Sequence, residues 1–218
     1  MKGLMLKDLF LLKGNKMLYV IVFVIVINVA FTSVDAAFIV SYVTMIMSMM
    51  VISTISYDDF DKSNVFLLTL PITRKQYVAE KYCLGFLLTG IGWLISSLVA
   101  LFLQYMDNAS LINTDWFIII GMLYFIGCVF LVFMIPLQLK FGGENGGIVM
   151  IACAFVLILI GSGIIALCNF LHIDLNFIYE YLNKLQTIQI MLGMIILVGI
   201  SLMISYGISL HILLKKQF

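Results

Sequence analysis

The sequence predicts an all-α integral membrane protein with six transmembrane helices and both termini on the cytoplasmic side. Three observations support this prediction: an apolar composition, six long runs without charge, and an uneven distribution of basic residues around those runs. Of the 218 residues, 64% are hydrophobic and 11% are charged, and the mean hydropathy is +1.19. Soluble domains are about half apolar and a quarter charged, so a surface this apolar needs lipid around it.

The six uncharged runs have the length that a membrane span requires. A helix needs about 20 apolar residues to cross a hydrocarbon core about 30 Å thick. Strict two-residue alternation is absent from the runs, which argues against a β-barrel. We expect one transmembrane domain over residues 1–218, and the expected spans are residues 17–34, 37–57, 82–105, 116–138, 147–169 and 187–212.

Two stretches allow a different interpretation. Residues 169–184 mix polar with aromatic and aliphatic side chains, and the sequence leaves open whether they re-enter the membrane edge as short helices. A cleaved signal peptide is the alternative for residues 1–37, because basic residues precede the first apolar run. That run is long for a signal peptide and its cleavage signal is weak, so we expect a span.

The basic residues determine the expected orientation, because they concentrate in the cytoplasmic loops of membrane proteins. With the amino terminus inside, eleven of the twelve Lys and Arg residues fall on the inner side, and only Lys184 falls outside. The opposite orientation would reverse this distribution. We therefore expect a multi-pass membrane protein with both termini in the cytoplasm.

The sequence lacks the residue patterns of catalytic and metal sites. Neither the GxSxG of serine hydrolases nor the HExxH of zinc proteases occurs, and the glycine-rich residues 142–147 lack the Lys-Ser/Thr of a phosphate-binding loop. His172 and His211 have no partner at metal-ligand spacing, and the four cysteines are spaced as buried free thiols. We therefore expect no catalytic residue, cofactor or metal here, so any pumping needs energy from another chain.

A repeat of small residues marks the third span. Gly92, Ser96 and Ala100 recur at four-residue spacing, which lets helices approach closely. Packing within the chain is the simpler explanation, and contact with a second copy is the alternative.

The inner segment between the second and third spans, residues 58–81, is the most informative. It opens with an acidic cluster, Asp58, Asp59 and Asp61, and an apolar run too short to span follows before Pro71 interrupts the chain. This order predicts a short helix at the inner face that docks a cytoplasmic partner. An interfacial helix that rests on anionic lipid headgroups is the alternative.

A helix start signal precedes the third span. Thr73 is a favourable cap, and Gln76 three residues later completes a capping box. Arg74 and Lys75 follow the cap, so we expect a basic helical entry into the membrane.

Four stretches of the sequence, in order, resemble permease subunits of bacterial ABC-2 type transporters. Each is degenerate alone, but together they cover both termini and both inner loops. The stretches are MKGLMLKDLFLLKGNK at residues 1–16, LLTLPITRKQYVAEKY at 67–82, IPLQLKFGGENGG at 135–147 and SYGISLHILLKKQF at 205–218. Gly147 departs from the resemblance, because the family usually has a basic residue there.

The resemblance implies the transmembrane half of an exporter, a multi-pass protein of the bacterial cell membrane. Such permeases have six spans, pair as homodimers or heterodimers, and dock cytoplasmic ABC ATPase subunits that bind ATP and magnesium. An amphipathic interfacial helix containing Lys7 and Asp8 would lie at the amino terminus, and a coupling helix would lie within residues 58–81. The residues then expected to couple to the ATPase are Asp61, Leu70, Pro71, Arg74, Lys75, Lys140, Phe141 and Gly142.

The expected function is therefore export of a hydrophobic or amphipathic substrate, such as a peptide, a drug or a lipid-like molecule. A membrane scaffold or immunity protein that anchors a cytoplasmic partner without transport is the alternative. We expect the lipid bilayer and the ATPase as partners, and no nucleic acid. The sequence leaves open the substrate, the direction of transport and the identity of the second permease copy.

Overall fold

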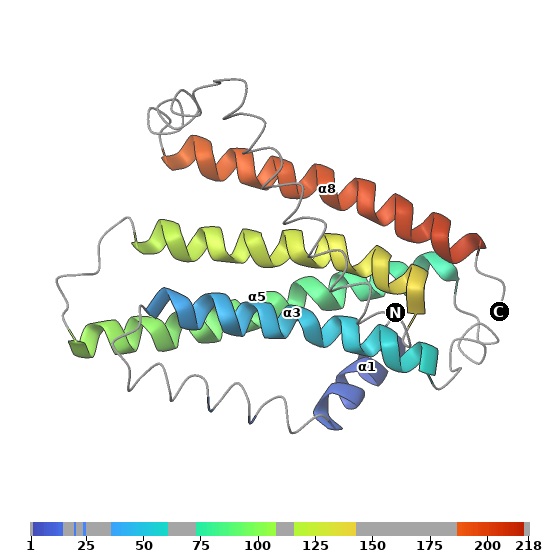
Figure 1. The fold of residues 1–218 in the computed structure, drawn as a ribbon, viewed down its shortest axis with the longest axis horizontal. Helices are drawn as coiled ribbons and strands as arrows, with labels where there is room; N and C mark the ends of the chain where they lie inside the picture. Colours follow the sequence, from blue (N-terminus) through green and yellow to red (C-terminus); the bar gives the residue numbers. More distant parts are fainter. Residues whose placement is uncertain are drawn as a thin grey trace, which may run out of the picture.

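The computed structural model describes residues 2–14, 20, 24, 36–60, 73–107, 116–142 and 187–215, and all of these except Thr73 are helical (Figure 1). The all-α prediction is therefore confirmed for this part of the chain. The helices are α1 (Lys2–Gly14), α3 (Ala36–Phe60), α5 (Arg74–Asp107), the helix Trp116–Gly142 and α8 (Thr187–Lys215).

Four of these helices are long and apolar enough to cross a membrane: Ala37–Asp59, Arg74–Met106, Trp116–Gly142 and Met191–Lys215. They correspond to the expected spans 37–57, 82–105, 116–138 and 187–212. The expected spans 17–34 and 147–169 fall almost entirely outside the described residues, so six spans stay a prediction.

The four long helices lie side by side along one axis, and the short α1 lies obliquely at one end (Figure 1). Contacts join α5 to both α3 and α8, and join α1 to both α3 and α5. We call this end of the bundle the α1 end. The helices α3, Trp116–Gly142 and α8 finish there, whereas α5 begins there (Figure 1).

The basic residues of the described helices all belong to the α1 end. Their positions are Lys2, Lys7, Lys13, Arg74, Lys75, Lys81, Lys140 and Lys215. The opposite ends of the four long helices carry no Lys or Arg within the described ranges. The charge asymmetry that the sequence predicts is therefore also an asymmetry of the folded bundle.

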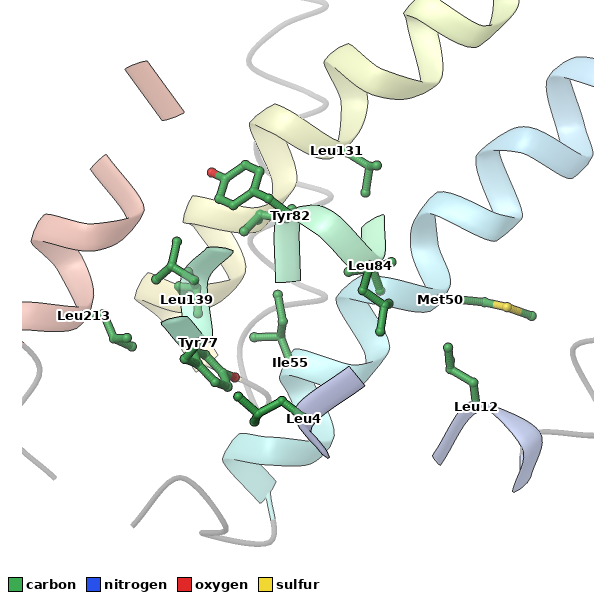
Figure 2. Packing of buried hydrophobic residues seen from close by; sticks show 13 residues of the cluster. Leu4, Leu12, Met50, Ile55, Tyr77, Tyr82, Leu84, Leu131, Leu139 and Leu213 are labelled. Carbon is green, nitrogen blue, oxygen red and sulfur yellow. The ribbon is translucent and has the colours of Figure 1, made fainter. Parts of the chain in front are cut away.

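The largest buried apolar cluster lies at the α1 end and takes residues from all five helices. Leu4 of α1, Ile55 of α3, Leu84 of α5, Leu139 of the helix Trp116–Gly142 and Leu213 of α8 are among its members (Figure 2). In lipid, such contacts act through close packing, because the surrounding acyl chains are as apolar as the side chains themselves. This cluster joins the short α1 to the bundle.

Small residues permit close approach between helices. A Cβ atom added to Gly127 would lie 2.9 Å from Cγ2 of Thr44 and 3.1 Å from Cγ2 of Thr89. One added to Gly92 would lie 2.5 Å from Cγ of Met47. Ser96 and Ala100 are also buried, so packing within the chain accounts for the small-residue repeat.

The cysteines follow the prediction only in part. Cys83 and Cys128 are free thiols, as expected, and Cys128 is buried. Cys83 is exposed, so the expectation of a buried thiol is wrong at that position. Its place on α5 turns it away from the packed faces, which an apolar run alone does not indicate. The other two cysteines lie outside the described residues.

We predict that Gly127→Ala lowers the stability of the bundle by about 1–3 kcal/mol, because the added methyl group overpacks the contact with α3 and α5. Gly199→Ala is the matched control, since a Cβ at Gly199 meets nothing within 4 Å. Thermal unfolding of the purified protein in detergent measures both. Equal unfolding temperatures for the two variants would contradict this account of the packing.

Candidate functional site

Four charged side chains from three helices meet at the α1 end. We call them the α1-end ion cluster: Lys7 and Asp8 of α1, Asp58 of α3 and Lys81 of α5. Asp8 and Lys81 are 0% exposed, Asp58 is 1% exposed, and Lys7 is 31% exposed. Each lysine lies against both aspartates, so the cluster joins helices that are distant in the sequence.

Lys81 is the centre of the cluster. An ammonium group has three N–H donors, and three acceptors surround this one. It donates to Oδ2 of Asp8, lies 2.9 Å from Oδ2 of Asp58, and donates to Oγ1 of Thr54 at 3.2 Å. Asp8 belongs to α1, whereas Asp58 and Thr54 belong to α3. This one side chain of α5 therefore contacts both α1 and α3.

Asp58 is satisfied on both carboxylate oxygens. Its Oδ1 accepts a hydrogen bond from Lys7, and its Oδ2 accepts one from the hydroxyl of Tyr77 at 3.0 Å. Tyr77 and Lys81 are four residues apart, so they lie on one face of α5. The same face therefore supplies a neutral donor and a charged donor to one carboxylate.

The face that α1 presents to the bundle follows a four-residue spacing. Leu4, Asp8 and Leu12 are all buried, and the carboxylate lies between the two leucines. Leu6 and Phe10 are exposed on another face. One side of α1 thus contacts the bundle and the other is apolar and open, although its position at a membrane interface stays a prediction.

Glu80 stands beside the α1-end ion cluster without a direct contact. It is 1% exposed, and neither carboxylate oxygen has a hydrogen-bond partner among the described residues. The cluster already balances two lysines with two aspartates, so Glu80 adds an excess acidic group. Burial of an unpaired charged group is costly, which favours a protonated, neutral Glu80.

The predicted capping box at the start of α5 is confirmed. The amide of Thr73 donates to Oε1 of Gln76 at 3.1 Å, and the amide of Gln76 donates to Oγ1 of Thr73 at 3.3 Å. Arg74 follows the cap, and its guanidinium donates to the carbonyl oxygens of Leu213 and Leu214. These carbonyls belong to the last turn of α8, which has no intrahelical donors for them.

The helix Trp116–Gly142 has its own link to α3 at this end. The side-chain amide of Gln138 donates to Oγ of Ser56 at 2.6 Å and to the carbonyl oxygen of Gly142 at 3.2 Å. Gly142 has a φ of +76°, a conformation that costs other residues about 1–2 kcal/mol. A Cβ there would also lie 2.6 Å from Oδ2 of Asp59. Both the backbone conformation and the lack of space therefore favour glycine at this position.

The predicted coupling residues differ in their exposure and contacts. Lys75, Lys140 and Phe141 are exposed at the α1 end, and the ammonium of Lys140 lies 5.2 Å from the ring centre of Phe141. Arg74 and Gly142 contact neighbouring helices, as described above. The remaining three, Asp61, Leu70 and Pro71, lie outside the described residues. Their coupling role stays a prediction for the whole set.

Sequence reasoning missed the buried cluster as a site. Lys7 and Asp8 were expected to lie on an interfacial helix, Lys81 was expected only to end the inner segment 58–81, and Glu80 received no role. The available signal was the position of opposite charges immediately beside apolar runs, where burial forces charges to pair. Within the described ranges, no group of three His, Cys, Asp or Glu residues is arranged to hold a metal ion.

A family model described as "ABC-2 family transporter protein" matches residues 3–213 of the chain. No curated relative matches the chain.

We predict that Lys81→Met costs about 3–5 kcal/mol of stability, because it leaves two buried carboxylates, Asp8 and Asp58, with Lys7 as their one remaining counter-charge in the cluster. Lys75→Met is the control, since Lys75 is exposed, and it should change stability by less than about 0.5 kcal/mol. Denaturant unfolding in detergent measures both values. A loss of similar size in the two variants would contradict a special role for the cluster.

Proposed function

The chain belongs to the ABC-2 family of transporter proteins, and on this premise we propose that it is the permease subunit of an ABC exporter. Family membership makes it a membrane component of a transporter and implies an ATPase partner in general. The proposal adds the direction and the cargo: a hydrophobic or amphipathic molecule moves outward, driven by ATP that a separate subunit hydrolyses.

The observation that carries the proposal is the convergence of helix ends and basic residues at the α1 end. Basic residues favour the cytoplasmic side, so we place the α1 end in the cytoplasm. The last residue of α3, Phe60, and the cap of α5, Thr73, then both belong to that side. The intervening residues 61–72 would be presented to a cytoplasmic ATPase.

The contacts at the α1 end supply a route by which force on this segment could reach the spans. A push on residues 61–72 would act on α3 and α5 together, because Lys81 and Asp58 join these helices. Arg74 would pass the displacement to α8 through its contacts with the Leu213 and Leu214 carbonyls. Movement of an inner loop would thereby become movement of several spans.

The composition of the described spans supports an apolar or amphipathic cargo. Their charged residues lie at the α1 end or at the final residue of α5, away from the centres of the helices. A route without charge at its centre offers no compensation for a strongly polar molecule. A hydrophobic or amphipathic peptide, a drug or a lipid-like molecule therefore fits such a route better than an ion or a sugar.

The function is tested with the chain and its ATPase reconstituted together in lipid vesicles. We predict that the two proteins co-purify, that candidate amphipathic peptides stimulate ATP hydrolysis, and that these peptides cross the membrane. A stable complex that neither transports nor responds to any candidate would contradict the exporter and favour the scaffold alternative.

The same preparation tests coupling with a matched pair of variants. Phe141→Ala should lower ATPase binding or stimulated hydrolysis several-fold, because Phe141 is 41% exposed at the α1 end. Phe117→Ala removes an equal side chain that is 54% exposed at the opposite end of the same helix, and it should leave coupling unchanged. Equal effects of the two variants would contradict docking at the α1 end.

A further inference from the structure

A cleft of about 830 Å³ lies between the helix Trp116–Gly142 and α8, toward the α1 end. This volume lies within the range of pockets that bind small molecules, about 300–1,000 Å³. Its apolar walls include Val132, Phe133 and Leu137 on one side and Ile204, Ile208 and Ile212 on the other. The walls therefore favour a hydrocarbon occupant.

The two serines that line the cleft, Ser201 and Ser205, already form hydrogen bonds within the protein. Ser205 donates to the carbonyl oxygen of Val132 and is hydrogen-bonded to the hydroxyl of Tyr82. Ser201 donates to the carbonyl oxygen of Val198 at 2.9 Å. A hydrocarbon chain in the cleft would leave neither hydroxyl without a partner.

The mouth of the cleft is basic. Lys140, His211 and Lys215 line it at the α1 end, and no acidic side chain is among the lining residues. Within the described part of the chain, neither Lys140 nor Lys215 forms an ion pair. Ser201 and Lys215 are fourteen residues apart, so the cleft extends roughly 20 Å along α8 from its basic mouth.

We propose that this cleft binds an anionic phospholipid, with an acyl chain along the apolar walls and the phosphate at Lys140 and Lys215. Basic pockets between transmembrane helices recognise anionic lipid headgroups on the cytoplasmic side. Phe133, Ile204 and Ile208 are each about half exposed, so the apolar walls open toward the surroundings of the bundle, where lipid would lie. The inference does not depend on the chain being an exporter.

The test uses the purified full-length chain in detergent, titrated with phosphatidylglycerol or with phosphatidylcholine of the same acyl chains. Native mass spectrometry counts the retained lipids and gives the dissociation constants. The wild-type chain should retain phosphatidylglycerol in preference to phosphatidylcholine. Equal affinity for the two lipids would overturn the proposal.

The charged mouth is tested by the double variant Lys140→Gln and Lys215→Gln. Each lost lysine should weaken phosphatidylglycerol binding about fivefold, so the double variant should lose roughly 25-fold. Lys13→Gln removes an exposed lysine that lies outside the cleft, and it should leave the dissociation constant unchanged. An equal loss in the control would show non-specific attraction and overturn the proposal.

The role of the apolar walls is tested by placing a larger side chain inside the cleft. Ile208→Trp should abolish retention of phosphatidylglycerol, whereas Ile196→Trp should preserve it, because Ile196 is exposed on α8 outside the cleft. Unchanged retention in the Ile208 variant would overturn the proposal. That is the result expected if residues 143–186 of this chain cover the cleft instead of lipid.

Discussion

The ammonium group of Lys81 has no exposed surface, and the oxygen atoms that surround it come from two other helices. Asp8 of α1 and Asp58 with Thr54 of α3 supply those oxygens. A charge without access to water is stable only where its partners are held in place, because desolvation costs several kcal/mol per ion. The positions of α1, α3 and α5 at this end therefore depend on one another.

The location of this constraint is as important as its strength. Apolar packing between helices in lipid is weakly directional, so it permits small sliding movements. The buried ion pairs fix the register of three helices at the α1 end, and Arg74 adds α8 through its last carbonyls. At their opposite ends, within the described residues, no comparable ion pair joins the helices. A bundle held in this way would support the force transmission from the α1 end that we propose.

The sequence predicted the features that depend on local pattern. Runs of apolar residues located the four described helices that are long and apolar enough to cross a membrane, because length and hydropathy are both properties of the local sequence. The capping box of Thr73 and Gln76 was also predictable, since both members lie within one turn. The family resemblance, carried by four short stretches, agrees with the match over residues 3–213.

The features that the sequence did not predict depend on contacts between distant segments. Asp8 and Lys81 are 73 residues apart, and although each lies beside an apolar run, the local sequence does not indicate which opposite charge it pairs with. From the sequence, Arg74 was expected to contact the ATPase. In the structure its guanidinium instead donates to the carbonyl oxygens of Leu213 and Leu214, which are 139 and 140 residues later. Helical spacing assigned each residue to a face of its own helix, but it did not determine which neighbouring helix that face contacts.

Hydrogen–deuterium exchange of α1 tests most directly whether Lys81 holds this end together. Amide protection reports the free energy of local opening. If the α1-end ion cluster fastens α1 to α3 and α5, the amides of α1 should lose protection in Lys81→Met while those of the helix Trp116–Gly142 keep theirs. Unchanged protection of α1 in that variant would contradict the account.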